Sequence, residues 1–188
     1  MVLNKVRKAE TTMQCSTDEA AMSNTQQDLA VRIQALEDRL DIIQLIMSYP
    51  LILDSGSSEY VRSAWSSTGI FDRGNENPAK HSGSYLGAYG VDKMIEETTG
   101  AAVREAREKG MAHLMTSPHV VVDGDHAVAT NYCQLVQRDG ETFLSPRVTS
   151  NRWELVRQNG RWKIERRVLR LLTGSKESRD LLGRELTP

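Results

Sequence analysis

Cysteine is scarce in this sequence: the two cysteines, Cys15 and Cys133, lie far apart in the chain. Two such thiols do not make a disulfide framework or a metal site. The four histidines follow no metal-ligand spacing either. We therefore expect a reduced, cytoplasmic protein that uses neither a metal nor another cofactor.

Long apolar runs and an excess of one charge are missing as well. No stretch reaches the roughly eighteen consecutive apolar residues of a membrane span. The formal net charge is −1 and the isoelectric point is about 6.4, which gives no electrostatic reason to expect nucleic acid or an anionic membrane as a partner. Residues 1–10 include basic side chains, but no apolar segment follows them, so we expect no secretory signal.

The chain of 188 residues and 21.1 kDa is long enough for one domain with a substantial core. Residues 1–24 are polar and contain few large apolar side chains, which predicts a loosely ordered arm. We assign residues 25–174 to the folded domain and residues 175–188 to a C-terminal tail.

A long amphipathic helix is predicted after the arm. Thr25 and Asp28 form a capping pattern. Apolar residues then recur at steps of three and four, at Leu29, Ile33, Leu36, Leu40, Ile43 and Met47. Pro50 should kink or end this helix. The apolar run beyond it stops at Asp54, an unusual place for a carboxylate.

The strongest local signal is the turn Asn159-Gly160, which predicts a hairpin over Glu141 to Leu172. On the outgoing strand, alternation places Trp162, Ile164 and Val168 on one face and Lys163, Glu165 and Arg167 on the other. On the incoming strand, Thr149, Asn151, Trp153 and Leu155 share a face. An asparagine beside a tryptophan there suggests a lined cavity.

The remaining segments complete an α+β pattern. We expect a short helix capped by Ser57 or Ser58 and carrying Val61 and Trp65, a brief strand over 69–72, a loop over 73–90, a helix over 91–109, and strands over 111–122 and 126–137. The residues Thr98-Thr99-Gly100 weaken the middle of the second long helix. Helices followed by a meander indicate a curved antiparallel sheet with the N-terminal helices on its concave face.

Several of these features together carry a resemblance. They are the apolar helix ending in Leu53-Asp54-Ser55-Gly56, the short helix containing Trp65, the segment Ala112-His113-Leu114, the strand from Val128 to Val136, and the run from Trp153 to Ile164. In this pattern, residues 28–172 resemble the SnoaL-like families of the cystatin-like, nuclear-transport-factor-like α+β cones. This superfamily includes scytalone dehydratase, bile-acid dehydratase, ketosteroid isomerase and polyketide cyclases.

The resemblance implies roles for three residues. Asp54 and His113 match the catalytic aspartate and histidine of the dehydratases, and Asn151 falls at a pocket asparagine of scytalone dehydratase. Two departures accompany the match. The tyrosine that precedes the aspartate in scytalone dehydratase is Leu53 here, and the second catalytic histidine has no counterpart near residues 134–138.

Four further residues are candidates for substrate binding, namely Tyr49, Tyr132, Trp153 and Arg147. Two functions remain open. The first is a cofactor-independent lyase or isomerase acting on a small, largely apolar cyclic or polyketide-like molecule. The second is a ligand-binding protein or a non-catalytic small subunit of the kind found in ring-hydroxylating dioxygenases.

Self-association is expected from the same sequence. The predicted helix before residue 41 carries more apolar surface than one cone requires. We therefore expect a homodimer, with a trimer as the alternative.

Overall fold

The computed structural model describes residues 3–74, 86–184 and 186, with side chains described from residue 25 onward. It divides into two units, residues 1–38 and 39–188, each of which is treated by itself. The first unit is helical from Leu3, where helix α1 (Leu3–Ser55) begins. The loose arm expected for residues 1–24 is thus helical from residue 3. The segment is rich in Ala, Glu, Met, Gln and Lys, which are good helix formers.

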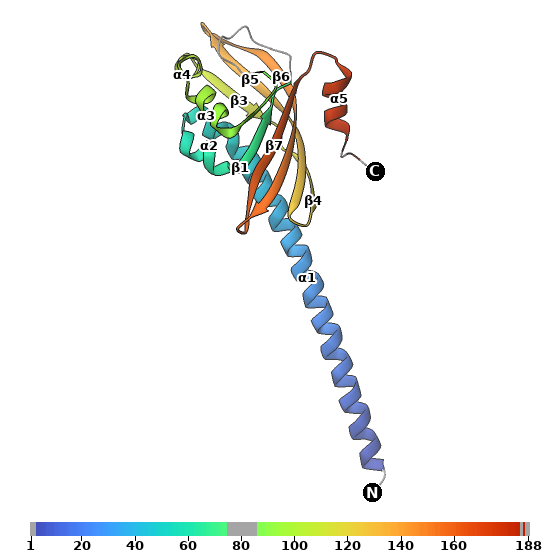
Figure 1. Ribbon diagram of the computed structural model, residues 1–188. Helices are drawn as coiled ribbons and strands as arrows, with labels where there is room; N and C mark the ends of the chain where they lie inside the picture. Colours follow the sequence, from blue (N-terminus) through green and yellow to red (C-terminus); the bar gives the residue numbers. More distant parts are fainter. Residues whose placement is uncertain (1–2, 75–85, 185, 187–188) are drawn as a thin grey trace. The chain divides into compact units, whose positions relative to one another are not determined.

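The second unit is built on a curled, open sheet, and the predicted α+β class is confirmed (Figure 1). Its described strands are β1 (Trp65–Asp72), β2 (Ala88–Gly90), β3 (Met111–Met115), β4 (His119–Asp123), β5 (His126–Asp139), β6 (Thr142–Gln158) and β7 (Arg161–Leu171). Their order is β2-β1-β7-β6-β5-β3, with β4 also paired to β5. Every pair is antiparallel except β1 with β7, which is parallel.

The helices of this unit are the last part of α1 together with α2 (Ser58–Ala64), α3 (Val91–Thr99), α4 (Ala101–Glu108) and α5 (Lys176–Gly183). We expected Pro50 to kink or end helix α1. The helix continues through Pro50 to Ser55, so it does not end at the proline. Its buried residues Ile42, Ile46, Tyr49 and Leu53 recur at helical spacing. Burial of this apolar face compensates for the backbone hydrogen bond that is lost at Pro50.

Three predicted boundaries differ from the structure. Trp65 begins β1 instead of lying in α2. The helix expected over 91–109 breaks at Gly100, whose extended backbone separates α3 from α4. The strand expected over 111–122 is divided into β3 and β4, because the intervening residues include Pro118, which has no N–H for a ladder. Part of the loop expected over 73–90 lies outside the described residues, and its last three residues form strand β2, which pairs with β1.

The predicted hairpin of β6 and β7 is confirmed, and both turn residues have positive φ, 52° at Asn159 and 73° at Gly160. Trp162 is only 6% exposed and belongs to the core. One detail was wrong. Leu155 pairs with Ile164 but Glu154 pairs with Arg166, so Glu165 is an extra residue, as in a β-bulge.

The bulge reverses the faces of β7 beyond Glu165. Arg167 lies opposite Trp153 and shares its buried face, although simple alternation placed it on the other side. The concave face therefore has a buried guanidinium that the sequence pattern did not predict.

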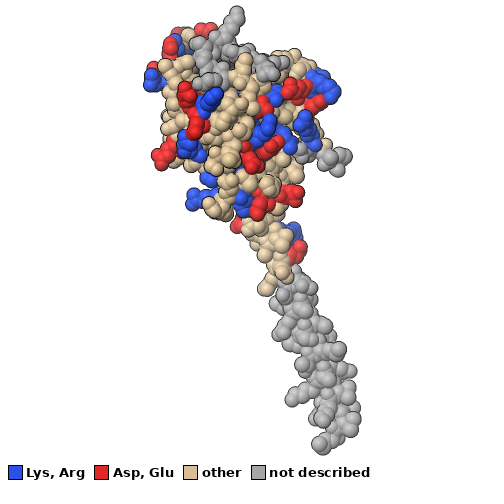
Figure 2. Space-filling model, in the orientation of Figure 1, with Lys and Arg blue, Asp and Glu red and all other residues tan. Residues whose placement is uncertain are grey.

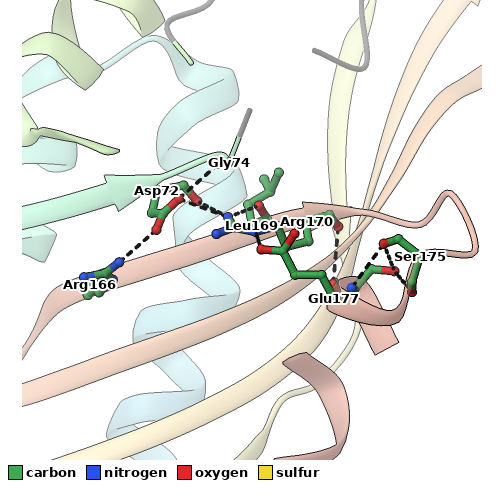
Figure 3. A network of polar contacts seen from close by, with 9 residues as sticks. Asp72, Gly74, Arg166, Leu169, Arg170, Ser175 and Glu177 are labelled. Atoms are coloured by element: carbon green, nitrogen blue, oxygen red, sulfur yellow. Dashed lines mark hydrogen bonds and ion pairs between the residues drawn. The ribbon is translucent and has the colours of Figure 1, made fainter. Parts of the chain in front are cut away.

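A polar network lies around the end of β1 (Figure 3). The carboxylate of Asp72 accepts hydrogen bonds from Arg166 at 2.8 Å, from Arg170 at 3.0 Å and from the backbone N–H of Gly74. Burial works against ionisation of Asp72, but these donors prevail and its pKa is lowered. Arg170 also donates to Glu177 of α5. The expected C-terminal tail thus contains a helix held against β6 and β7.

Charge is mixed on the face of the molecule shown in Figure 2, where basic and acidic side chains alternate without a large patch of either sign. Of the helices in the described part of the chain, none is long and apolar enough to cross a bilayer.

Candidate active site

A cavity of about 420 Å³ lies between the concave face of the sheet and side chains of α1, α3 and α4. Ligand pockets in proteins commonly begin at a few hundred Å³. Much of the lining is apolar and includes Leu53, Phe71, Met94, Val103, Leu135 and Leu169. The cavity can therefore take a small ligand with a hydrophobic skeleton.

Asp54 and His113 meet at the wall of this cavity. The Nδ1 atom of His113 lies 2.6 Å from Oδ1 of Asp54, and the backbone N–H of His113 donates to Oδ2 at 2.7 Å. Both contacts are made by Asp54 at the end of α1, and the one to the backbone N–H holds strand β3 in place. Because a carboxylate accepts, Nδ1 carries the proton, and Nε2 of a neutral ring is left as a base. The His113 side chain lines the cavity.

The surroundings of His113 keep it neutral. Burial lowers the pKa of its imidazole most strongly, and the positive charges of Arg147 and Arg167 lower it further. The hydrogen bond that His113 donates to Asp54 and the charge of that carboxylate oppose this shift without reversing it. At neutral pH the ring is therefore uncharged, and its Nε2 is able to accept a proton.

Arg167 is the principal residue that sequence reasoning missed. It is 3% exposed, and its Nε and Nη2 donate to Oδ1 of Asn151 at 3.1 and 2.8 Å. Its guanidinium lies over Trp153, with 4.3 Å between Cζ and the ring centroid, and also near Tyr49. The side chain lines the cavity. Only recognition of the bulge at Glu165 could have placed it there.

Asn151 and Trp153 lie behind the cavity wall and are absent from its lining. The amide of Asn151 donates to Thr149 and accepts from Arg167, while Nε1 of Trp153 donates to Asn131 at 2.9 Å. Both were expected to bind substrate directly. In the structure they support Arg167 instead.

Tyr49 does line the cavity. Its hydroxyl donates to the sulfur of Met94 at 3.1 Å, and burial raises its pKa although the charge of Arg167 opposes the shift. A thioether is a weak acceptor, so this hydroxyl can be redirected to a better one. Tyr49 stands one helical turn before Leu53 on α1.

Tyr132 is not part of the site. It pairs with Ser150 across the sheet and is 44% exposed. Alternation explains this position, because the inward residues of β5 are its odd-numbered neighbours Asn131 and Cys133. Arg147, in contrast, lines the cavity as expected for a residue on the face of Thr149 and Asn151.

A second polar group lines the cavity on α3 and at the end of β1. Glu97 accepts hydrogen bonds from Arg73 and from the hydroxyl of Tyr89. Burial raises the pKa of Tyr89. Nearby, Arg107 donates to the backbone oxygens of Leu53 and Thr98, which fastens the end of α1 beside Asp54. No sequence motif marks these residues.

Among residues 25–74, 86–184 and 186, no three histidine, cysteine, aspartate or glutamate side chains gather as a metal site would require. The polar groups that are present can bind oxygen atoms and move a proton.

Comparison with known proteins identifies the fold and family. The family model of the SnoaL-like domain matches residues 34–168. A crystal structure of an NTF2-like protein with a cystatin-like fold from Novosphingobium aromaticivorans is 32% identical, with a TM-score of 0.72 over 82% of this chain and 94% of that one.

More distant structures share the fold alone. Rv3472 from Mycobacterium tuberculosis, described as of unknown function, is 21% identical over 81% of this chain and 88% of its own, with a TM-score of 0.58. A proposed scytalone dehydratase from N. aromaticivorans is 16% identical over 74% and 87%, with a TM-score of 0.55. No curated protein matches the sequence. On the match to residues 34–168 and the 32% identical structure, the chain belongs to the SnoaL-like domain family.

Proposed function

We propose that this protein is a cofactor-independent lyase or isomerase in which Asp54 and His113 move a proton on a small cyclic or polyketide-like substrate. The observation that carries the proposal is the 2.6 Å contact between His113 Nδ1 and Asp54 Oδ1 at the wall of a cavity. The hydrophobic lining supports a substrate with an apolar skeleton. The SnoaL-like family includes dehydratases and isomerases.

The geometry of the pair supports the following proton transfer. Nε2 of His113 removes a proton from a carbon next to a carbonyl group, and the C–H electron pair moves toward the carbonyl oxygen. In a dehydration, a C=C bond then forms as the C–O bond to a β-hydroxyl breaks, and the imidazolium returns the proton to that oxygen to give water. In an isomerisation, the same proton returns to a different carbon.

Asp54 and Tyr49 assist this step in different ways. The Asp54 carboxylate holds the Nδ1–H tautomer and stabilises the imidazolium while it exists. The Tyr49 hydroxyl can turn from Met94 to the substrate carbonyl, where it would stabilise the developing negative charge. Its raised pKa keeps the phenol protonated for this purpose.

A carbon-acid assay tests the proposal. The bicyclic ketones 2-tetralone and 1-indanone are first ranked by calorimetric binding, and hydrogen–deuterium exchange of the tighter ligand's α-protons is then followed by NMR in D₂O. We expect the wild-type protein to accelerate exchange and His113→Ala to lose about 10²- to 10⁴-fold of that rate. Asp54→Asn should also slow exchange, since it removes the charge that stabilises the imidazolium.

Circular dichroism and ketone binding serve as the controls for folding. A wild-type rate no higher than that of a folded His113→Ala protein, with the ketone bound, would contradict the proposal. That result would favour the ligand-binding alternative.

A further inference from the structure

Arg147 and His113 belong to one cross-strand row of the sheet. His113 of β3 pairs with Leu135 of β5, and Leu135 pairs with Arg147 of β6. Side chains in register across neighbouring strands point to the same face. Two strand spacings separate the Cα atoms of His113 and Arg147 by about 10 Å. Both side chains line the cavity, with Leu135 between them.

Arg147 also differs from the other arginines of the cavity. Arg73 is paired with Glu97, and Arg167 donates to Asn151. No side chain or backbone oxygen within the described residues accepts a hydrogen bond from Arg147, and no described carboxylate is ion-paired with it. Of the two cavity glutamates, Glu97 is engaged by Arg73 and Glu96 is exposed.

The position of Arg147 makes an unpaired charge costly. Burial lowers the pKa of its guanidinium to about 10, with a further contribution from the charge of Arg73, so the group still carries its proton at neutral pH. The Arg147 side chain is half-buried. A cation partly removed from water without a partner is unfavourable, and an anion that enters beside it relieves the cost. A carboxylate fits best, because its two oxygens match the fork of N–H donors on a guanidinium.

We infer that the ligand of this cavity carries a carboxylate that binds Arg147. The apolar skeleton of the ligand then lies over Leu135 and reaches toward Nε2 of His113. Binding of a carboxylate at Arg147 does not depend on the proposed function. Only the identification of this ligand as the substrate rests on that function. It narrows the substrate class from apolar cyclic molecules to cyclic acids.

Binding of a matched pair of probes tests the subsite. 2-Naphthoate and 2-naphthamide have the same ring system and differ in charge. Calorimetry at pH 7 should show at least tenfold tighter binding of 2-naphthoate to the wild-type protein. Arg147→Gln should abolish this preference. Arg152→Gln, which changes an arginine on the opposite face of the same strand, should retain it.

Equal affinity of the wild-type protein for the two probes would overturn the inference, as would a preference that survives in Arg147→Gln. The folded His113→Ala protein should keep the preference, because binding requires no proton transfer. A wild-type protein that does not accelerate ketone exchange but keeps the 2-naphthoate preference would refute the catalytic proposal alone. The reverse pattern would refute the Arg147 subsite alone.

An independent observation concerns helix α1. Its apolar side chains Leu29, Val31, Ile33, Leu36 and Leu40 are between 48% and 66% exposed. Apart from Val31, these residues alternate at steps of four and three, so that Ile33 and Leu40 fall at heptad position a and Leu29 and Leu36 at position d. Such a stripe is typical of a coiled-coil seam.

The charged residues that flank the apolar stripe favour a parallel orientation of the second helix. In a parallel pair, position g of one helix faces position e of the following heptad in its neighbour. Arg32 at g would then face Glu37 of the partner subunit. In an antiparallel pair the g positions face one another, and these are Thr25, Arg32 and Arg39, which include no acid.

We infer that α1 forms a parallel two-stranded coiled coil with a second copy of this chain, which makes the protein a homodimer. Sedimentation at micromolar concentration should give a dimer for the wild-type protein and a monomer for Leu36→Asp. Val31→Asp is the matched control, because Val31 is at least as exposed as Leu36 but lies at position f, outside the seam. It should remain a dimer.

A charge exchange tests the orientation. Arg32→Glu should weaken the dimer, and adding Glu37→Arg should restore it. A monomeric or trimeric wild-type protein, or a Leu36→Asp protein that stays dimeric, would overturn the coiled coil. Failure of the double variant to recover affinity would overturn the parallel register.

Discussion

Asn151 is expected to contribute to stability well beyond an ordinary buried asparagine, because it is the acceptor for the buried guanidinium of Arg167. Asn151→Ala removes the oxygen that receives two N–H donors at 3.1 and 2.8 Å. Breaking the partner of a buried charge costs about 3–5 kcal/mol in comparable cases. Stacking of Arg167 on Trp153 remains and offsets only a small part.

Asn131 provides a matched control in the same cross-strand row. Asn131 pairs directly with Asn151 in the sheet and is also buried, but it bonds only neutral partners, the indole N–H of Trp153 and the backbone oxygen of Thr116. Neutral hydrogen bonds contribute about 0.5–1.5 kcal/mol each. Asn131→Ala should therefore cost less than Asn151→Ala.

Urea unfolding followed by tryptophan fluorescence measures both free energies. The double variant Asn151→Leu, Arg167→Met should recover much of the loss, because it removes the buried charge together with its acceptor, and apolar replacement of buried charged groups is often neutral. A cost for Asn151→Ala no larger than that for Asn131→Ala would refute the reasoning. So would a double variant less stable than Asn151→Ala alone.

Two further predictions concern the core and pH. Trp162→Ala should cost about 3–5 kcal/mol in urea unfolding, as large core aromatics do, and a cost below about 1 kcal/mol would mean that the indole lies outside the core. His113 has a pKa lowered by burial from its unfolded value of about 6.5. Below that value the unfolded chain takes up a proton more readily than the native one, so stability is full above it and falls as the pH drops toward the native pKa. The free energy of unfolding should therefore decrease on acidification in the wild-type protein and less so in His113→Gln; an equal or larger decrease in His113→Gln would argue against a lowered native pKa.

Much of the fold could be predicted because its signals are local. The Asn159-Gly160 turn needs positive φ at both residues, and alternation then gives the burial of Trp153, Leu155 and Trp162. The contact of Asp54 with His113 could be expected from the resemblance and from the cost of a carboxylate at the end of an apolar run.

The remaining differences arise where tertiary structure overrides a local pattern. Glu165 resembles any other polar strand residue in the sequence, yet as an extra residue it turns Arg167 inward. Pro50 would end an isolated helix, but the buried face around Tyr49 carries α1 past it. The bond between Arg73 and Glu97 joins residues that no motif connects.

The second hydrogen bond of Asp54 has a consequence for solubility. β3 is an edge strand of the sheet, and an unpaired N–H on such an edge invites pairing with another molecule. Asp54 Oδ2 accepts a hydrogen bond from the backbone N–H of His113 at 2.7 Å, so this N–H is not available to pair with another molecule. Asp54→Asn can keep an oxygen at this position, whereas Asp54→Ala leaves the N–H open. Aggregation on heating should therefore separate these two variants, with the alanine protein aggregating first.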